Sequence, residues 1–379
     1  MDLQNYISAV ARRVCKLAPI RSNKVAFCSY YGRGYSDNPK AVAEALRAAN
    51  ADLDLVWLVK NEAEGKSLPA GIRPVSYTNP VSRAWHLATA KVWVDNCRKG
   101  ERLKRKDQYY MQTWHGFALK QIEKDASDAL GPAYVQSCMQ DSKDCDLMVA
   151  GSKFMGDLHR KSFWYDGEVA LYGTPRNDVF FQDNSELKEQ VHGFWNLPKE
   201  RKVVLYAPTF RADHSTDCYA LDAKKLVEAC ARRFGGEWSA LIRLHPNVAG
   251  QSKGLFPYDG LDVIDATAYP DMQELLIACD LLITDYSSSM FDYALSGKPC
   301  IQFALDIEDY KKDRGFYFPL DKLPFPMARS NEELCAIVAD FDEESQQKRW
   351  TAFTEENGFC EDGHAAERCA QWILERMKG

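Results

Sequence analysis

Short apolar runs alternate with amphipathic helical patterns along nearly the whole chain. After Pro19, strand candidates in the first half cover 24–29, 53–59, 72–77, 90–96, 109–114, 146–151 and 168–173. Strand candidates in the second half cover 202–209, 239–246, 261–266, 280–286 and 299–304. Helical patterns lie between several of them, over 38–49, 79–90, 152–163, 222–234, 269–279 and 287–297. This alternation predicts an α/β architecture with largely parallel sheets that are covered on both faces.

The length of 379 residues predicts two domains, because a single core rarely grows that large. The most polar gap in the pattern is 182–202, directly before a strong strand candidate. We therefore expect an N-terminal domain over 23–190 and a C-terminal domain over 191–362. An amphipathic helix over 363–379 can pack back on the first domain. Two such domains are expected to face each other across a cleft, with ligands beyond the carboxyl ends of the strands.

Composition narrows the functional classes. The net charge of −6 argues against a general nucleic-acid binder, and the chain has no apolar run near the ~20 residues of a membrane-spanning helix. The 12 cysteines are scattered singly, without C-x-x-C or zinc-ligand spacing, which is typical of reduced thiols in a cytosolic protein. No glycine-rich nucleotide motif, nucleophile elbow or paired-carboxylate metal cluster is present.

The first 22 residues combine an apolar stripe with positive charge. The stripe is formed at helical spacing by Leu3, Tyr6, Ile7, Val10, Val14 and Leu17. The positive charge comes from Arg12, Arg13, Lys16 and Arg21, with Lys24 just beyond this segment. Such a helix suits the headgroup region of an anionic bilayer. Packing on the chain's own domain explains the pattern equally well, and both interpretations stay open.

Three consecutive serines follow the strand candidate at 280–286. Ser287, Ser288 and Ser289 stand where a helix is expected to begin. Unpaired backbone N–H groups and partial positive charge at a helix start favour phosphate oxygens, and serine hydroxyls add donors. A simple N-cap accounts for one serine but not for three. The pattern therefore favours a phosphate site.

Histidines and arginines stand at other strand ends. Arg243 and His245 alternate to one face before Pro246, where a histidine can bind pyrophosphate or stabilise a leaving phosphate. Arg176 and Arg211 follow proline turns and are possible anion ligands, although such turns are also common structural features. His115 ends the run at 109–114 and is either a packing residue or a group that moves a proton.

Eight blocks in order give the chain a resemblance to a known family. They are "GYSDNPKAVAEAL", "QTWHG…LK…KD", "YGTPRND", "LYAPTFR", "RLHPN", "DLLITDYSSSMFDYALSGKP", "RGFYF" and "DGHAAER", between residues 23 and 368. Together they resemble the CDP-glycerol glycerophosphotransferases of teichoic acid and capsule synthesis. The resemblance implies two Rossmann-like domains of the GT-B type. It also implies transfer of a polyol phosphate from a CDP-polyol to an acceptor hydroxyl with release of CMP.

The resemblance assigns roles to residues. The catalytic pair is His115 and His245, with His115 as the base for the incoming hydroxyl. The C-terminal half is implied to bind the donor through Pro208, Thr209, Arg211, Arg243, Asp285, Ser287, Ser288 and Ser289. The acceptor side is implied to include Trp114, Gly116, Lys120, Asp125, Arg176, Asn177 and Asp178. Lys120 and Asp125 could equally be solvated helix charges. No metal or other cofactor is implied.

We therefore expect a transferase that acts in the cytoplasm, peripherally on the inner face of a bacterial cell membrane. Its expected partners are CDP-glycerol, a lipid-linked saccharide acceptor and the anionic membrane surface, with no nucleic acid and no predicted oligomeric state. A primase is favoured over a polymerase. The alternatives are a CDP-ribitol ribitolphosphotransferase and a nucleotide-sugar glycosyltransferase. Phe117 and Ala118 depart from the Thr-Pro that the family often has there, so we expect acceptor choice to depend on them.

Overall fold

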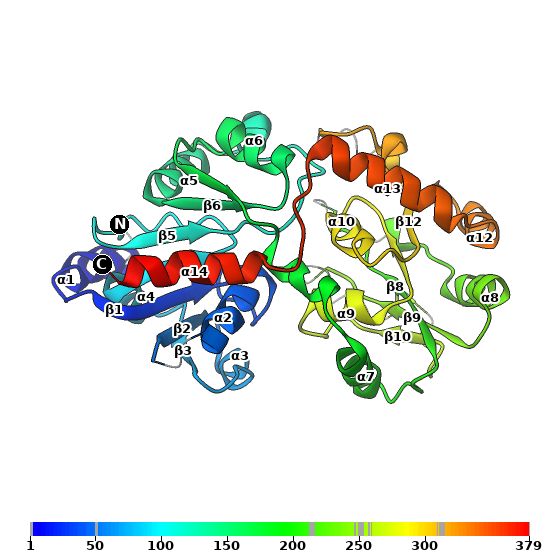
Figure 1. Cartoon of the computed structure of the whole chain (residues 1–379), viewed down its shortest axis with the longest axis horizontal. Coiled ribbons are helices and arrows are strands. Elements are labelled where there is room, and N and C mark those ends of the chain that lie inside the picture. The colour runs from blue at the N-terminus through cyan, green and yellow to red at the C-terminus, as the bar shows by residue number, and fades with distance from the viewer. Residues whose placement is uncertain are drawn as a thin grey trace. The chain divides into compact units, whose positions relative to one another are not determined.

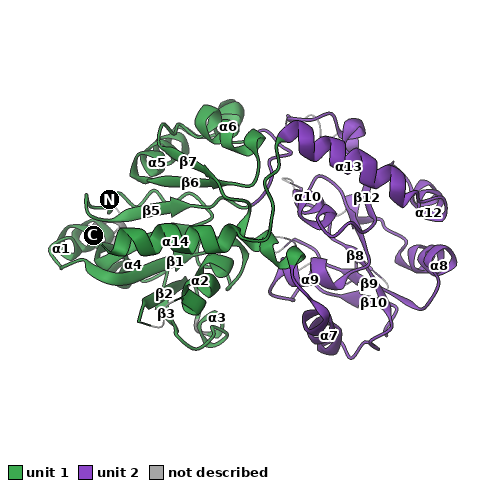
Figure 2. Cartoon of the chain, viewed as in Figure 1, with its two compact units in different colours: residues 1–115, 122–181, 358–379 green, residues 116–121, 182–357 purple. Residues whose placement is uncertain are grey.

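The chain folds into two compact units (Figure 2). The computed structural model describes all residues except 1–2, 50–51, 212–216, 246–247, 249–253, 257, 259, 309, 311–314 and 379. Unit 1 comprises residues 1–115, 122–181 and 358–379, and unit 2 comprises residues 116–121 and 182–357. These bounds differ from the expected ranges 23–190 and 191–362, since residues 116–121 and 182–190 belong to unit 2 and residues 358–362 belong to unit 1.

Unit 1 is built on a seven-stranded parallel sheet with the order β3-β2-β1-β4-β5-β6-β7. The strands are β1 (Arg21–Cys28), β2 (Asp54–Val59), β3 (Ile72–Ser76), β4 (Ala90–Asp95), β5 (Tyr109–Gln112), β6 (Leu147–Ala150) and β7 (Glu168–Leu171). The helices are α1 (Leu3–Cys15), α2 (Asp37–Ala49), α3 (Glu62–Lys66), α4 (Pro80–Thr89), α5 (Pro132–Asp144), α6 (Lys153–Ser162) and α14 (Ala365–Met377). Two short 3-10 segments complete the unit, η1 (Glu123–Ala129) and η2 (Pro175–Phe181).

The C-terminal helix α14 is part of the core of unit 1, where it packs on α2 (Figure 1). Trp372 and Ile373 join α2 and the central strands in one apolar cluster. The Asp178 carboxylate accepts hydrogen bonds from the first backbone N–H groups of α14, from Ala365 at 3.0 Å and Ala366 at 2.7 Å. These N–H groups have no partner within the helix, so Asp178 caps it.

Unit 2 is built on a six-stranded parallel sheet with the order β10-β9-β8-β11-β12-β13. The strands are β8 (Lys202–Tyr206), β9 (Trp238–Ile242), β10 (Val263–Asp265), β11 (Leu281–Thr284), β12 (Cys300–Phe303) and β13 (Met327–Ala328). The helices include α7 (Ser185–Phe194), α8 (Ala223–Phe234), α9 (Met272–Ala278), α10 (Ser289–Ala294), α12 (Asn331–Ala339) and α13 (Glu343–Asn357). The shorter η3 (Asp217–Tyr219) and η5 (Leu320–Lys322) are 3-10 helices.

The prediction of two α/β domains with parallel sheets is confirmed. In each unit the strand order runs outward in both directions from one adjacent pair, β1 and β4 in unit 1 and β8 and β11 in unit 2. The loops after such a pair leave the sheet toward opposite faces and open a crevice at the carboxyl ends. The loops after these four strands are therefore the first place to look for a ligand site.

Every strand and helix range predicted from the pattern overlaps an observed element, but several elements were not predicted. Those missed include β13, which is two residues long, and the helices α5, α7, α12 and α13. α7 lies inside the polar stretch 182–202, which the pattern predicts to be a gap between domains. α13 reads EESQQKRWTAFTEEN and buries few of its residues, so no clear apolar stripe marks it.

Helix α1 packs against α4 yet leaves part of its apolar stripe uncovered. Ile7, Val10 and Val14 are 39%, 41% and 60% exposed, and Leu17 just after the helix is 86% exposed. The side chains of Leu3 and Tyr6 lie outside the described residues. Among the helices that the structure describes, none is both long and apolar enough to cross a bilayer. Packing on its own unit therefore accounts for only part of the apolar stripe.

Candidate functional site

In unit 1, polar side chains gather where β1, β4, β5 and β7 end. Tyr30 follows β1, Asn96 follows β4, His115 follows β5 and Arg176 follows β7, while Asp37 opens α2. Parallel strands place all these carboxyl ends at one edge of the sheet. Hydrogen bonds connect the side chains or backbone of all five residues. His115 is thus part of a polar network, whereas Trp114 beside it packs on Phe163 with ring centroids 4.7 Å apart.

The His115 ring has a defined tautomer. Its Nδ1 lies 2.7 Å from the backbone carbonyl oxygen of Asn96. A carbonyl oxygen only accepts, so Nδ1 carries the proton and donates it, which leaves Nε2 with a lone pair in the neutral ring. Burial lowers the pKa of His115 below its usual value, and the hydrogen bond to Asn96 and the charge of Asp37 partly oppose this effect. A half-buried imidazole in this state is suited to accept a proton at Nε2.

Arg176 is held inside unit 1 by an acidic partner and by the loop that carries His115. Its Nη1 donates to Asp37 Oδ2 at 2.5 Å and to the carbonyl oxygen of His115 at 3.1 Å. The two side chains of the pair are only 8% and 5% exposed. Arg176 was predicted as an anion ligand on the acceptor side. That role stays a prediction, because the guanidinium is already matched by a carboxylate.

The loops around His115 contain non-glycine residues in the left-handed region of backbone conformation. The φ angles are +44° for Tyr30, +66° for Asp37 and +53° for Trp114. L-residues adopt this region at a cost of order 1–3 kcal/mol each, and such residues cluster at functional sites. Asn38 stabilises the turn, because its Nδ2 donates to the Trp114 carbonyl at 2.9 Å. The backbone before His115 is therefore constrained from several sides.

The other residues expected on the acceptor side have different surroundings. Asp125, in η1, accepts a hydrogen bond from Ser162 Oγ at 2.6 Å. Asn177 is buried in η2, and Asp178 caps α14 as described above. Gly116 has a φ of +123°, a conformation that L-residues rarely adopt. Asp178 thus has a structural role as the cap of α14, and this role does not require a ligand.

The short segment 116–121 packs in unit 2 rather than in unit 1. Phe117 is 7% exposed, and its ring contacts Phe291, Phe318 and Phe353 at centroid distances of 4.6, 5.7 and 5.8 Å. Lys120 Nζ donates to Tyr310 Oη at 3.0 Å, so Lys120 also lies in unit 2, not in the N-terminal domain to which it was assigned. The burial of Phe117 makes it a core residue, which does not favour our expectation that it selects the acceptor.

In unit 2, Arg211 is the centre of a buried ion-pair cluster after β8. Its Nη2 donates to Asp285 Oδ2 at 2.8 Å, and its Nε donates to Asp306 Oδ2 at 2.6 Å. Asp285 Oδ1 accepts the backbone N–H groups of Thr209 and Tyr286 at 2.8 and 2.6 Å. Burial disfavours the charge of Arg211, but the two carboxylates outweigh it and raise the arginine pKa. Asp285 thus joins the loops that follow β8 and β11 through Arg211.

The three serines follow β11, which together with β8 is the strand pair at which the strand order of unit 2 reverses. Ser287 and Ser288 are half-buried and Ser289 is buried, with Ser287 Oγ and Ser289 Oγ 2.8 Å apart. Ser288 occupies the N-cap position of α10, but its side chain makes no capping hydrogen bond. Ser287 Oγ accepts the backbone N–H of Ser289 at 3.3 Å, so capping of the helix start accounts for Ser287 but not for Ser288 or Ser289. α10 is only six residues long, shorter than the helical pattern over 287–297 predicted.

His245 lies beyond the end of β9, at the same edge of the sheet as Thr209 and Ser287. It is exposed, and its ring lies 5.5 Å from the ring of Phe210. Arg243 Nη1 donates to the Tyr269 carbonyl at 2.5 Å, while Pro246 lies outside the described residues. Pro208 is buried directly after β8. The predicted donor-side residues therefore follow β8, β9 and β11 and share one edge of the unit 2 sheet.

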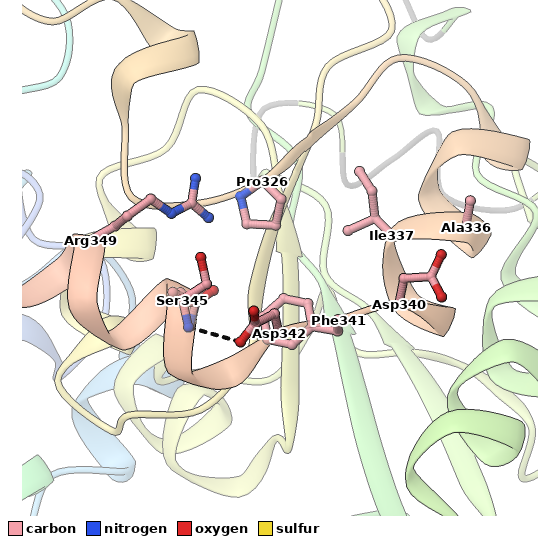
Figure 3. Close-up of a pocket in the computed structure, with 9 residues that line it drawn as sticks. Pro326, Ala336, Ile337, Asp340, Phe341, Asp342, Ser345 and Arg349 are labelled. Carbon is pink, nitrogen blue, oxygen red and sulfur yellow. Dashed lines mark hydrogen bonds between the residues drawn. The ribbon is translucent and has the colours of Figure 1, made fainter.

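Unit 2 also has a pocket of about 360 Å³ away from this edge (Figure 3). It lies between the end of α12, the start of α13 and the residue before β13. Its walls are formed by Pro326, Ala336, Ile337, Asp340, Phe341, Asp342, Ser345, Gln346 and Arg349. None of the residues predicted for the donor or the acceptor side lines this pocket.

Comparison with known proteins gives a consistent match over the chain. The family model for CDP-glycerol:poly(glycerophosphate) glycerophosphotransferase matches residues 10–375. The teichoic acid poly(glycerol phosphate) polymerase of Bacillus subtilis (strain 168) is 32% identical over 333 residues, which cover 84% of this chain but only 44% of that protein. The teichoic acid glycerol-phosphate transferase of Staphylococcus aureus (strain NCTC 8325 / PS 47) is 31% identical over 370 residues, 93% of each protein.

A solved structure is also similar to the chain. The wall teichoic acid polymerase TagF superposes with a TM-score of 0.83 at 27% sequence identity, covering 98% of this chain and 94% of that one. The chain thus spans less than half of the Bacillus subtilis polymerase, yet nearly all of the solved TagF chain.

Replacement of Phe117 tests whether the segment 116–121 is part of the unit 2 core. We expect Phe117→Ala to lower the free energy of unfolding of unit 2 by about 3–5 kcal/mol, because it removes a buried ring from an aromatic cluster. Hydrogen exchange of the β8 and β11 backbone amides, followed by mass spectrometry, measures this change. Leu261→Ala, at a position of unit 2 that is 40% exposed, is the control and should change little. Equal small effects of both variants would contradict the core assignment.

Proposed function

Because the chain belongs to the CDP-glycerol:poly(glycerophosphate) glycerophosphotransferase family, we propose that it transfers glycerol phosphate from CDP-glycerol to an acceptor hydroxyl and releases CMP. The proposed acceptor is a lipid-linked saccharide of teichoic acid or a related polymer. The match with the Staphylococcus aureus glycerol-phosphate transferase over 93% of both proteins supports this assignment. The observation that carries it in the structure is the tautomer of His115, which leaves Nε2 ready to accept a proton.

In the proposed reaction His115 acts on the acceptor. Its Nε2 takes the proton of the acceptor hydroxyl as that oxygen forms a bond to the β-phosphorus of CDP-glycerol. The bond between this phosphorus and the bridging oxygen breaks, and CMP leaves with the electron pair. Positioning and charge stabilisation supply most of the catalysis in phosphoryl transfer, so the remaining task is to stabilise the CMP oxygens.

We assign donor binding to the carboxyl edge of unit 2. Ser287 and Ser289 offer hydroxyl groups after β11, and the exposed His245 offers a ring nitrogen after β9. Arg211 is matched by Asp285 and Asp306, so its proposed task is to hold the donor loops in place. Serine hydroxyls, a histidine and backbone N–H groups can stabilise the leaving phosphate. The proposal therefore includes no metal or other cofactor.

We further propose that the protein acts as a primase, adding one glycerol phosphate to each acceptor, at the inner face of the cell membrane. The uncovered stripe of α1 supports the membrane part. Val10 and Val14 are exposed beside Arg12 and Arg13, which are also at the surface. Apolar side chains flanked by arginines fit the interface of an anionic bilayer.

The activity is tested by incubating the protein with CDP-glycerol, CDP-ribitol or UDP-sugars and a lipid-linked disaccharide. We expect CMP release with CDP-glycerol and a product that carries one glycerol phosphate, measured by mass spectrometry. Release of UDP alone would refute the phosphotransferase assignment. A preference for CDP-ribitol would show that the transferred polyol is ribitol. Long products would show that the protein is a polymerase and not a primase.

The role of His115 is tested by His115→Ala. We expect turnover to fall by at least about 100-fold, since a general base typically contributes this much. The Kd for CDP-glycerol, measured by calorimetry, should change little because His115 acts on the acceptor. His245→Ala is the matched variant, and it should weaken CDP-glycerol binding. Loss of donor binding in His115→Ala would refute the assignment of His115 to the acceptor.

The pH dependence follows from the lowered pKa of His115. A base works only in its neutral form, which persists at pH values above its pKa. Because burial lowers that pKa, we expect the acidic limb of kcat/KM to have its midpoint below pH ~6.5, the usual value for histidine. The pH profile of kcat/KM between about pH 4 and 8 measures this midpoint. A midpoint above that value would contradict the proposed environment of the base.

Membrane contact is tested with vesicles that contain phosphatidylglycerol. We expect the wild-type protein to sediment with these vesicles, and the double variant Val14→Glu/Leu17→Glu to remain in solution, because both side chains are exposed and apolar. Leu261→Glu, at an exposed position of unit 2, is the control and should sediment like the wild type. Undiminished sedimentation of the double variant would place the membrane contact elsewhere.

A further inference from the structure

Hydrogen bonds form a closed circuit around His115. Its Nδ1 donates to the Asn96 carbonyl, and Asn96 Oδ1 accepts the Tyr30 backbone N–H at 2.9 Å. Tyr30 Oη donates to Asp37 Oδ2 at 2.6 Å, and Asp37 pairs with Arg176. Arg176 Nη1 closes the circuit by donating to the His115 carbonyl. The circuit links both ends of the histidine, its ring and its backbone, to one buried ion pair.

The circuit also places opposite charges near the imidazole. Asp37 raises the pKa of His115 and Arg176 lowers it, while Glu123 raises it by a smaller amount. Tyr30 stays neutral, since burial raises its pKa well above the usual value. Burial would raise the pKa of Asp37 as well, but Arg176 and the Tyr30 hydroxyl offset this and leave it below the usual range. At neutral pH Asp37 is therefore ionised and Tyr30 is neutral.

We propose that Asp37 and Arg176, with Tyr30, form the positioning unit of His115, which orients its ring and balances the charge around it. This inference rests on the proposed role of His115 as the base. None of the three residues needs to touch a substrate in this role. Orientation of a catalytic histidine by a carboxylate is usually direct. Here the carboxylate acts through an arginine and a tyrosine.

The local energetics support a positioning role. A buried ion pair is costly to desolvate and is weak evidence for stability in itself, so its retention calls for another explanation. Asp37 and Tyr30 also keep unfavourable left-handed backbone conformations. Both costs are concentrated in residues that the circuit connects to His115. A purely structural pair would not need to hold the carbonyl of the proposed base.

Four variants separate orientation from charge. Asp37→Asn removes the negative charge but keeps an oxygen acceptor, and asparagine tolerates the left-handed conformation as aspartate does. Arg176→Gln removes the positive charge, whereas Arg176→Lys retains it. Tyr30→Phe removes only the hydroxyl group that binds Asp37 and changes no charge. Thermal unfolding of each variant identifies those that are folded at the temperature of the measurements.

The pKa of His115 is measured directly by NMR titration of the histidine ring protons, without any substrate. The signal of His115, one of seven histidines, is assigned by its absence in His115→Gln. We expect the pKa to fall in Asp37→Asn and to rise in Arg176→Gln, by about one unit in each case. Arg176→Lys and Tyr30→Phe should keep it close to the wild-type value. The acidic limb of kcat/KM should move in the same two opposite directions.

Opposite shifts, together with a kcat that falls about tenfold or more in Asp37→Asn while KM for CDP-glycerol is unchanged, would support the proposal. Shifts in the same direction, or none, would overturn it, since general damage to the fold does not separate the two charges. The NMR titration does not depend on activity. A wild-type protein that releases no CMP would therefore refute the proposed function, and unaltered titration curves would refute the positioning unit.

Discussion

The parallel pairing of β1 with β4 and of β8 with β11 is the constraint on which both candidate sites depend. At each pair the strand order reverses, and the following loops diverge at the carboxyl edge of the sheet. In unit 1 these loops supply Tyr30 and Asn96, which meet His115 from the neighbouring strand. In unit 2 the equivalent loops supply Arg211 and Asp285. The topology thus brings together side chains that are far apart in the sequence. Buried hydrogen bonds then hold these side chains in place.

Both arginines that follow proline turns are engaged by carboxylates. Arg176 pairs with Asp37, and Arg211 pairs with Asp285 and Asp306. Burial makes an unpaired charge too costly, so an arginine below the surface needs an anionic partner in the resting protein. An arginine near a predicted anion site is therefore not by itself an anion ligand. In this chain Arg176 and Arg211 hold loops together by pairing with carboxylates.

The fold could be predicted from the sequence because the alternation of apolar runs and helices is strong and local. His115 and the serine motif were found for the same reason, since each directly follows a recognisable strand. Among the partners of His115, Arg176 was named from the sequence, but the other three were not. Tyr30, Asp37 and Asn96 lie between 19 and 85 positions away in the sequence, and nothing local in the pattern marks them as its neighbours. The burial of Phe117 was not predicted either, because the passage of the chain into unit 2 after His115 leaves no signal in composition or periodicity.

The stretch from Trp114 to Phe117 contributes residues to both units. The carbonyl of His115 is held by Arg176 in unit 1, and two residues later Phe117 is buried in the aromatic core of unit 2. Gly116 between them adopts a φ of +123°, which a residue with a side chain would rarely reach. Within unit 1, the proposed base is therefore held by the Asn38 hydrogen bond to the Trp114 carbonyl on its N-terminal side and by Arg176 at its own carbonyl. Such restraint reduces the motion that a base must lose before it accepts a proton, which is the contribution that positioning makes to catalysis.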